Sequence, residues 1–106
     1  MTAIQHIDIS ELERLRSGGS LLLVDVRTDA EVARGIIAGA RHIPLQTLPQ
    51  RLGELQAGET TVVYCQSGGR SAQACVWLAQ QGFEKVYNLQ GGILAWLREG
   101  RPVAQP

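Results

Sequence analysis

Apolar residues along the chain cluster in short blocks that fit strands separated by helices. The two most continuous blocks, at residues 21–26 and 60–65, have the composition of strands buried on both faces of a parallel sheet. Shorter blocks at 4–7, 40–44 and 85–89 predict three more strands, and the direction of the first is left open. This alternation predicts an α/β fold, with a central, mostly parallel five-stranded sheet flanked by helices on both faces.

Helix signals fill the intervals between these blocks. Ser10 and Glu13 have the spacing of a reciprocal capping box, and Gly18 ends the segment that they begin. Thr28 and Glu31 repeat that spacing at the start of a shorter helix. Further helices are predicted at 47–55, 71–81 and 91–99, the second ended by Gly82 and the third by Gly100 and Pro102.

Length and charge narrow the classes of protein. The 106 residues are enough for one hydrophobic core, so we expect a single domain over residues 1–106 with a frayed tail at 101–106. Ten basic and ten acidic residues give no net charge, which argues against nucleic acid or an anionic membrane as partner. No apolar run is long enough to span a bilayer, and the first ten residues lack the pattern of a signal peptide.

Cysteine usage points to a reducing compartment. Two cysteines make no disulfide framework, and the chain has no cluster of Cys and His with metal-ligand spacing. We therefore expect a cytoplasmic protein without a structural metal, in which at least one thiol is free to react.

One junction combines several chemical signals: the stretch CQSGGRS at residues 65–71, between a predicted strand and a predicted helix. Cys65 lies at the carboxyl end of a central strand, where open α/β sheets bind ligands. The loop of Gln66, Ser67, Gly68 and Gly69 is expected to curl so that its amides and those of the helix start converge on an anion. That field would also lower the pKa of the thiol and supply a thiolate nucleophile.

Arg70 and Ser71 complete this predicted anion site. Arg70 adds a planar cation that can grip an oxyanion, and Ser71 can cap the helix or donate one more hydrogen bond. We predict Cys65 as the catalytic residue and the six residues that follow it as substrate-binding. The competing interpretation, a buried strand cysteine followed by a simple turn, does not account for two glycines, an arginine and a helix start within six residues.

Other chemistry-bearing residues are weighed against plain structural roles. Asp25 and Arg27 flank the end of a central strand and either orient the catalytic loop or tie that strand end to neighbouring turns. Cys75 falls on an apolar helix face and is expected to be buried and inert. Structural roles are also expected for His6, His42, the Gly91–Gly92 pair, Trp77 and Trp96.

Three motifs in order resemble those of rhodanese-type sulfurtransferases. Residues 65–71 look like that family's active-site loop, LLLVDVRTDAEVARGIIAGARHIP resembles its N-terminal signature, and VYNLQGGILAW resembles its C-terminal one. The resemblance implies a sulfurtransferase that carries sulfur as a Cys65 persulfide and needs no cofactor. Its sulfur donor would be thiosulfate or another persulfide, and its acceptor cyanide, a thiol or a protein of a sulfur relay.

Two alternatives stay open. The fold could serve as a non-catalytic or regulatory binding module, although an intact Cys65 favours catalysis. A Cys-dependent phosphatase or arsenate reductase is disfavoured because the related phosphatases use C-x5-R, whereas Cys65 and Arg70 enclose only four residues. The physiological donor and acceptor, the pathway and the oligomeric state are not indicated by the sequence.

Overall fold

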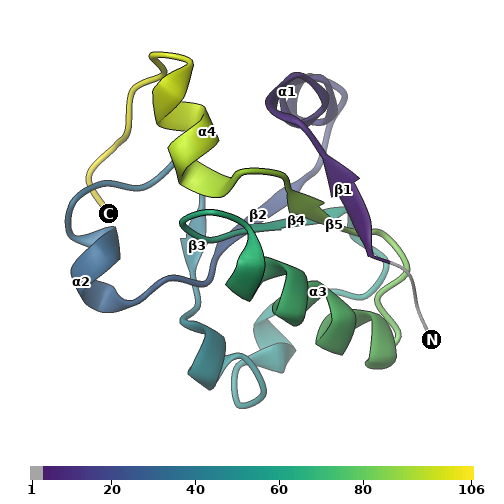
Figure 1. Ribbon diagram of the computed structural model, residues 1–106. Helices are drawn as coiled ribbons and strands as arrows, with labels where there is room; N and C mark the ends of the chain where they lie inside the picture. The colour runs from purple at the N-terminus through teal and green to yellow at the C-terminus, as the bar shows by residue number, and fades with distance from the viewer. Residues whose placement is uncertain (1–3) are drawn as a thin grey trace.

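The computed structural model describes residues 4–106 and shows one sheet with helices on both faces (Figure 1). The elements are β1 (Gln5–Ile7), α1 (Ile9–Ser17), β2 (Leu22–Asp25), α2 (Asp29–Val32), β3 (Arg41–His42), two short 3-10 helices η1 (Leu45–Thr47) and η2 (Leu52–Glu54), β4 (Thr61–Tyr64), α3 (Gly69–Gln80), β5 (Val86–Leu89) and α4 (Gly92–Arg98). The five strands lie in the order β1-β5-β4-β2-β3, and every neighbouring pair is parallel. The predicted α/β fold is confirmed, and the first strand is a parallel edge strand.

Two apolar cores lie on the two faces of the sheet, and successive side chains of β4 contribute to one core and then the other. Val62 and Tyr64 belong to the core that includes residues of α1 and α4. Val63 and Cys65 belong to the core that includes residues of α3. Successive strand residues point to opposite faces, so the register of β4 places Cys65 on the α3 side at the end of the strand.

Two helix predictions are wrong in detail. Asp8, not Ser10, caps α1: its carboxylate accepts the Glu11 amide at 2.8 Å, and the Glu11 carboxylate accepts the Asp8 amide. The segment predicted as one helix at 47–55 forms only η1, turns and η2. Pro49 has no amide hydrogen for an α-helical bond, and Gly53 lowers the helix propensity further.

The tail at 101–106, predicted to fray, is anchored as far as Ala104. Ile36 and Ala104 exchange two backbone hydrogen bonds of 2.9 and 2.7 Å in an antiparallel bridge. The indole of Trp96 donates to the carbonyl of Pro102 at 2.8 Å. These bonds hold the C-terminus beside α2, as Figure 1 shows.

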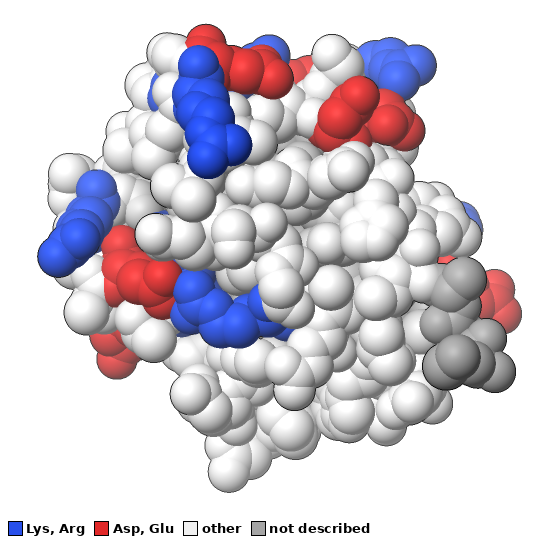
Figure 2. Space-filling view, in the orientation of Figure 1, with Lys and Arg blue, Asp and Glu red and all other residues white. Residues whose placement is uncertain are grey.

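Acidic and basic side chains are interspersed on the face shown in Figure 2, without a broad area of one sign. Within residues 4–106, none of the helices has the length and apolar character needed to cross a membrane.

Candidate active site

The carboxyl ends of β2, β4 and β5 meet at one edge of the sheet, and Cys65 lies there. It follows Tyr64, the last residue of β4, and its residue surface is 1% exposed. The next residues, Gln66 and Ser67, are exposed, and α3 begins at Gly69. Gly68 has φ +112°, a left-handed conformation that a glycine adopts without strain, and it turns the chain into the helix.

The Cys65 sulfur lies inside the turn that it begins. The Gly68 amide donates to Sγ at 3.1 Å, and the Ser71 hydroxyl lies 3.3 Å from Sγ. Burial opposes ionisation, but hydrogen bonds from Ser71, Gly68 and the Ser67 amide outweigh it and lower the pKa of the Cys65 thiol below its ordinary value of 9.0. Of the predicted site residues, Ser67, Gly68 and Ser71 therefore place hydrogen-bond donors at the sulfur, and these donors favour its ionised form.

Arg70 lies beside this loop and is paired with Glu31. Its two terminal nitrogens donate to the two carboxylate oxygens of Glu31 at 2.7 and 2.8 Å, a bidentate arrangement. Glu31 also accepts the Thr28 amide, as the predicted capping box requires. The sequence predicted only the capping role of Glu31. Its ion pair with Arg70, next to the loop that begins at Cys65, is a second role that sequence reasoning missed.

The Glu31–Arg70 pair gives folding stability a pH dependence. The hydrogen bonds from Arg70, which outweigh burial, lower the pKa of Glu31 from 4.5 to about 2. A depressed folded-state pKa contributes stability above the unfolded value, and that contribution is lost as pH falls through about 2. We expect Glu31→Gln to lower the free energy of unfolding by about 1 kcal/mol at pH 7, a small figure because the pair is partly exposed.

Urea denaturation of wild type and Glu31→Gln at several pH values measures this effect. The difference between the two proteins should be constant from pH 7 to about pH 5 and should shrink at lower pH. A difference that stays unchanged down to pH 2 would contradict an electrostatic origin.

Asp25 and Arg27 form a buried ion pair at the end of β2. The guanidinium donates to Asp25 at 2.7 and 3.0 Å, and the two side chains are 0% and 4% exposed. Arg27 also donates to the carbonyl of Gly35 at 2.7 Å and to that of Glu31 at 3.4 Å. These bonds tie the end of β2 to α2 and the turn after it, which is the structural role considered for this pair from the sequence. Arg27 also lines the same surface hollow as Gln66.

The first turn of α4 supports the loop from behind. The amides of Ile93 and Leu94 donate to the carbonyls of Cys65 and Gln66 at 3.0 and 3.1 Å. A Cβ on Gly92 would lie 2.5 Å from each of those oxygens. Gly92 thus allows the last helix to approach the loop closely, which is a structural role.

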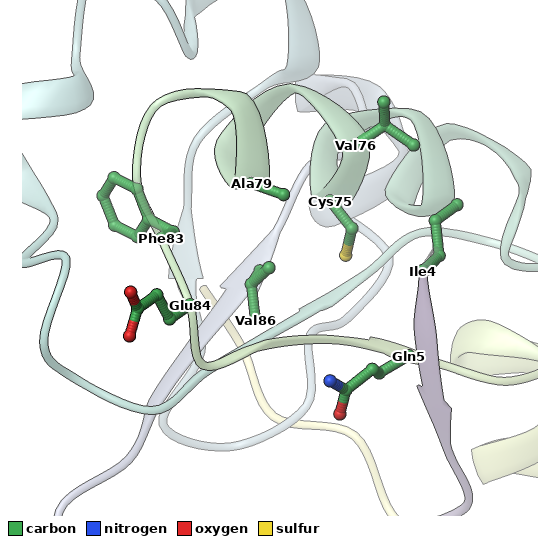
Figure 3. A pocket seen from close by; sticks show the side chains of 8 residues that line it. All are labelled: Ile4, Gln5, Cys75, Val76, Ala79, Phe83, Glu84 and Val86. Carbon is green, nitrogen blue, oxygen red and sulfur yellow. The ribbon is translucent and has the colours of Figure 1, made fainter. Parts of the chain in front are cut away.

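Cys75 belongs to the same apolar core as Cys65, in the layer between α3 and the sheet. Figure 3 shows its sulfur pointing from α3 toward the sheet, among Ile4, Ala79 and Val86. Its residue surface is 2% exposed, and burial raises the pKa of its thiol to about 12. This environment suits a packing role and disfavours a second nucleophile.

Both histidines make hydrogen bonds of a structural kind. His42 Nε2 lies 2.7 Å from the carbonyl oxygen of Arg27. His6 Nδ1 lies 3.2 Å from the side-chain nitrogen of Asn88, a residue that sequence reasoning did not single out. In the described part of the chain, no three His, Cys, Asp or Glu side chains gather in a way that could hold a metal ion.

Residues 8–99 match the model of the rhodanese-like domain. The chain belongs to the rhodanese-like family. It is 45% identical over 97% of its length to a sulfurtransferase of Allochromatium vinosum, of which 97% is covered. It is 31% identical over 91% of its length to the thiosulfate sulfurtransferase GlpE of Shewanella oneidensis, of which 95% is covered.

Solved structures agree with this assignment. A rhodanese-related protein from Thermoplasma volcanium superposes with a TM-score of 0.86 and 30% identity, over 96% of this chain and 99% of that one. A rhodanese-like domain protein from Staphylococcus aureus gives 0.84 and 34% identity, over 96% and 100% of the two chains. The family predicted from the three motifs is therefore confirmed, with sulfurtransferases among its relatives.

Proposed function

We propose that the chain is a sulfurtransferase that carries sulfane sulfur as a Cys65 persulfide. The observation that carries this proposal is the position of Cys65 Sγ. It receives the Gly68 amide and lies against the Ser71 hydroxyl where β4 ends and the 12-residue helix α3 begins. A thiolate held there is a ready nucleophile, and the backbone amides of the loop can stabilise the charge on the outer sulfur of a persulfide.

The reaction proceeds in two half-reactions. The Cys65 thiolate attacks the outer sulfur of thiosulfate, an S–S bond forms as the thiosulfate S–S bond breaks, and sulfite leaves with the electron pair. A thiolate or cyanide acceptor then attacks the outer sulfur of the persulfide, and the bonding pair returns to Cys65. Sulfite is a stable anion and needs no proton to leave, so neither a general acid nor a cofactor is required.

The order of these steps can be tested by kinetics and mass. Varying thiosulfate at several fixed cyanide concentrations should give parallel double-reciprocal lines, because one covalent intermediate separates the two substrates. Intact mass after thiosulfate alone should increase by one sulfur. Intersecting lines without a mass gain would exclude the carrier mechanism. A protein that neither turns over thiosulfate nor gains sulfur would favour the binding-module alternative.

Arg70 is expected to assist binding of the donor anion. Because Glu31 neutralises much of its charge, we expect Arg70→Ala to raise the KM for thiosulfate about fivefold, equivalent to ~1 kcal/mol, with a smaller change in kcat. Glu31→Gln is the matched control, since it frees the same guanidinium and should lower KM. Steady-state kinetics at fixed ionic strength measures both, and KM changes of the same sign would contradict the role.

The four residues between Cys65 and Arg70 support sulfur transfer over phosphoryl transfer. A phosphoryl group has three equatorial oxygens to accommodate, whereas the persulfide adds a single atom. The partner that supplies or accepts the sulfur is proposed to be a small anion such as thiosulfate or a protein thiol. A reducing compartment such as the cytoplasm would keep the two free cysteines available as thiols.

A further inference from the structure

The hydroxyl group of Ser71 lies between two possible hydrogen-bond acceptors. Its oxygen is 3.3 Å from Cys65 Sγ and 2.5 Å from Oδ1 of Asn88, and Ser71 is fully buried. A serine hydroxyl has one hydrogen to donate, so it cannot serve both acceptors at once. The Ser71 hydroxyl is one of the donors that lower the pKa of the Cys65 thiol, while the shorter distance to Oδ1 favours donation to Asn88.

The surroundings of Asn88 fix which end of its amide faces Ser71. The nitrogen Nδ2 lies 3.3 Å from the carbonyl oxygen of Gly68 and 3.2 Å from His6 Nδ1. Both are acceptors when the imidazole hydrogen is on Nε2, and an amide NH2 group has two hydrogens for them. Rotating the amide would place its oxygen against the Gly68 carbonyl. The oxygen Oδ1 therefore faces Ser71 and can only accept.

We propose that Asn88 is a positioning residue that takes the Ser71 hydrogen bond whenever Cys65 Sγ is uncharged and releases it when Sγ becomes a thiolate. In the thiol form Ser71 donates to Asn88. In the thiolate form Ser71 turns its hydrogen to the negative sulfur, where a charge-assisted bond is stronger. In the persulfide the charge moves to the outer sulfur, Sγ is neutral again, and Ser71 returns to Asn88.

The last of these steps rests on the proposed function, whereas the first two concern the thiol alone. A buried hydroxyl without an acceptor is unfavourable, so Asn88 stabilises the two neutral forms of Sγ relative to the thiolate. It thereby opposes ionisation of Cys65 and favours formation of the persulfide. An aliphatic side chain of similar size at position 88 would remove the second acceptor and leave the thiolate as the best partner for Ser71.

The reactivity of Cys65 toward iodoacetamide across pH measures this coupling. Trypsin cleaves after Arg51, Arg70 and Lys85, so Cys65 and Cys75 fall on different peptides and are followed separately by mass spectrometry. In Asn88→Leu the alkylation midpoint of Cys65 should fall by about half a pH unit to one unit. In Ser71→Ala it should rise by a similar amount, because the thiolate loses its hydroxyl donor.

The double variant distinguishes the hydrogen-bond switch from general loosening of the loop. If Asn88 acts through Ser71, Asn88→Leu in the Ser71→Ala background should leave the midpoint of Ser71→Ala unchanged. A rise of the midpoint in Asn88→Leu, no change at all, or the same fall in both backgrounds would overturn the proposal. Circular dichroism of each variant checks the fold.

The charged and titratable groups around the thiol are present in all four proteins. They are Arg70 and Cys75 on α3, Glu31 bound to Arg70, the Asp25–Arg27 pair at the end of β2 and His6 beyond Asn88. His6 loses its Asn88 contact in both Asn88→Leu proteins, so that change cancels when the effect of Asn88→Leu is compared between the two backgrounds.

A second measurement uses the wild-type chain and applies even if the Leu variant does not fold. The side-chain amide resonances of Asn88 should shift with the midpoint at which Cys65 is alkylated. Capping Cys65 with methyl methanethiosulfonate leaves Sγ neutral and should remove that step while sparing any step caused by His6. An Asn88 amide that does not respond to ionisation of Cys65 would overturn the proposal.

Measuring how much persulfide forms on Cys65 distinguishes the role proposed for Asn88 from the proposed sulfur transfer. Wild type that gains no sulfur from thiosulfate would refute sulfur transfer, while the alkylation midpoints would still decide the role of Asn88. If wild type does gain sulfur, Asn88→Leu should accumulate less persulfide at equilibrium with thiosulfate and sulfite, by about three- to tenfold. Equal amounts of persulfide in the two proteins would overturn the claim that Asn88 stabilises the persulfide, in which Sγ is neutral.

Discussion

Cys65→Ser is expected to abolish sulfur transfer, whereas Cys75→Ala should keep most of it. A serine hydroxyl does not ionise near neutral pH and cannot form a persulfide, so the loss should be on the order of 10³-fold or more. Cys75 has no part in the proposed reaction, because its sulfur lies in the apolar layer and burial raises its pKa to about 12. Thiocyanate formation from thiosulfate and cyanide gives the rates.

The mass of each variant after thiosulfate treatment locates the sulfur. Wild type and Cys75→Ala should each gain one sulfur, found on the tryptic peptide that contains Cys65, and Cys65→Ser should gain none. Loss of activity in both variants, with circular dichroism unchanged, would indicate a two-thiol mechanism. Persulfide on Cys75 in the Cys65→Ser protein would contradict its assignment as an inert packing residue.

The sequence predicted the features of this molecule that depend on neighbours along the chain. The strand end, the glycines and the helix start around Cys65 lie within a few residues, and their pattern alone indicated a loop with converging amides. The Thr28 capping box was correct for the same reason, since both partners lie in one helical turn. At α1 two equally spaced pairs competed, and Asp8 is the one in extended backbone geometry at the helix start.

Contacts between distant segments were not predicted. Glu31 and Arg70 are 39 residues apart, and Ser71 and Asn88 are 17 apart. Each pair meets only because β2, β4 and β5 are adjacent and parallel, so that the residues after β2 and β4 gather at the carboxyl end of β5, where Asn88 lies. The bridge between Ile36 and Ala104 likewise joins segments that are far apart in the sequence. Sequence reasoning placed Cys65 at the strand end that begins the loop, but the residues that hold the loop and its arginine required the tertiary structure.

Gly92 is the position where a single methyl group should disturb the active site most. A Cβ there would lie 2.5 Å from the carbonyl oxygens of Cys65 and Gln66, which are backbone atoms held by the amides of Ile93 and Leu94. Gly92 also has φ +59°, in the left-handed region that disfavours other residues. The added methyl group must push the first turn of α4 away from the loop that begins at Cys65.

Gly92→Ala is therefore expected to lower the free energy of unfolding by about 2–4 kcal/mol, from left-handed strain plus overpacking. Gly100→Ala at the other end of α4 is the matched control: its φ is +75°, but a Cβ there meets nothing within 4 Å. It should show the strain alone, about 1 kcal/mol. Urea denaturation gives the free energy of unfolding of each variant. The difference between the two values is the contribution of the clash with the loop.

The same pair of variants tests whether α4 holds the catalytic loop in its reactive shape. Displacing the Cys65 and Gln66 carbonyls should move the Gly68 amide away from Sγ and raise the alkylation midpoint of Cys65, with a loss of transfer under conditions where Gly92→Ala is fully folded. Gly100→Ala should keep the wild-type midpoint and rate. Equal activity in both variants would mean that the loop keeps its shape without support from α4, and that the Gly68 turn and the start of α3 alone place the donors around the sulfur.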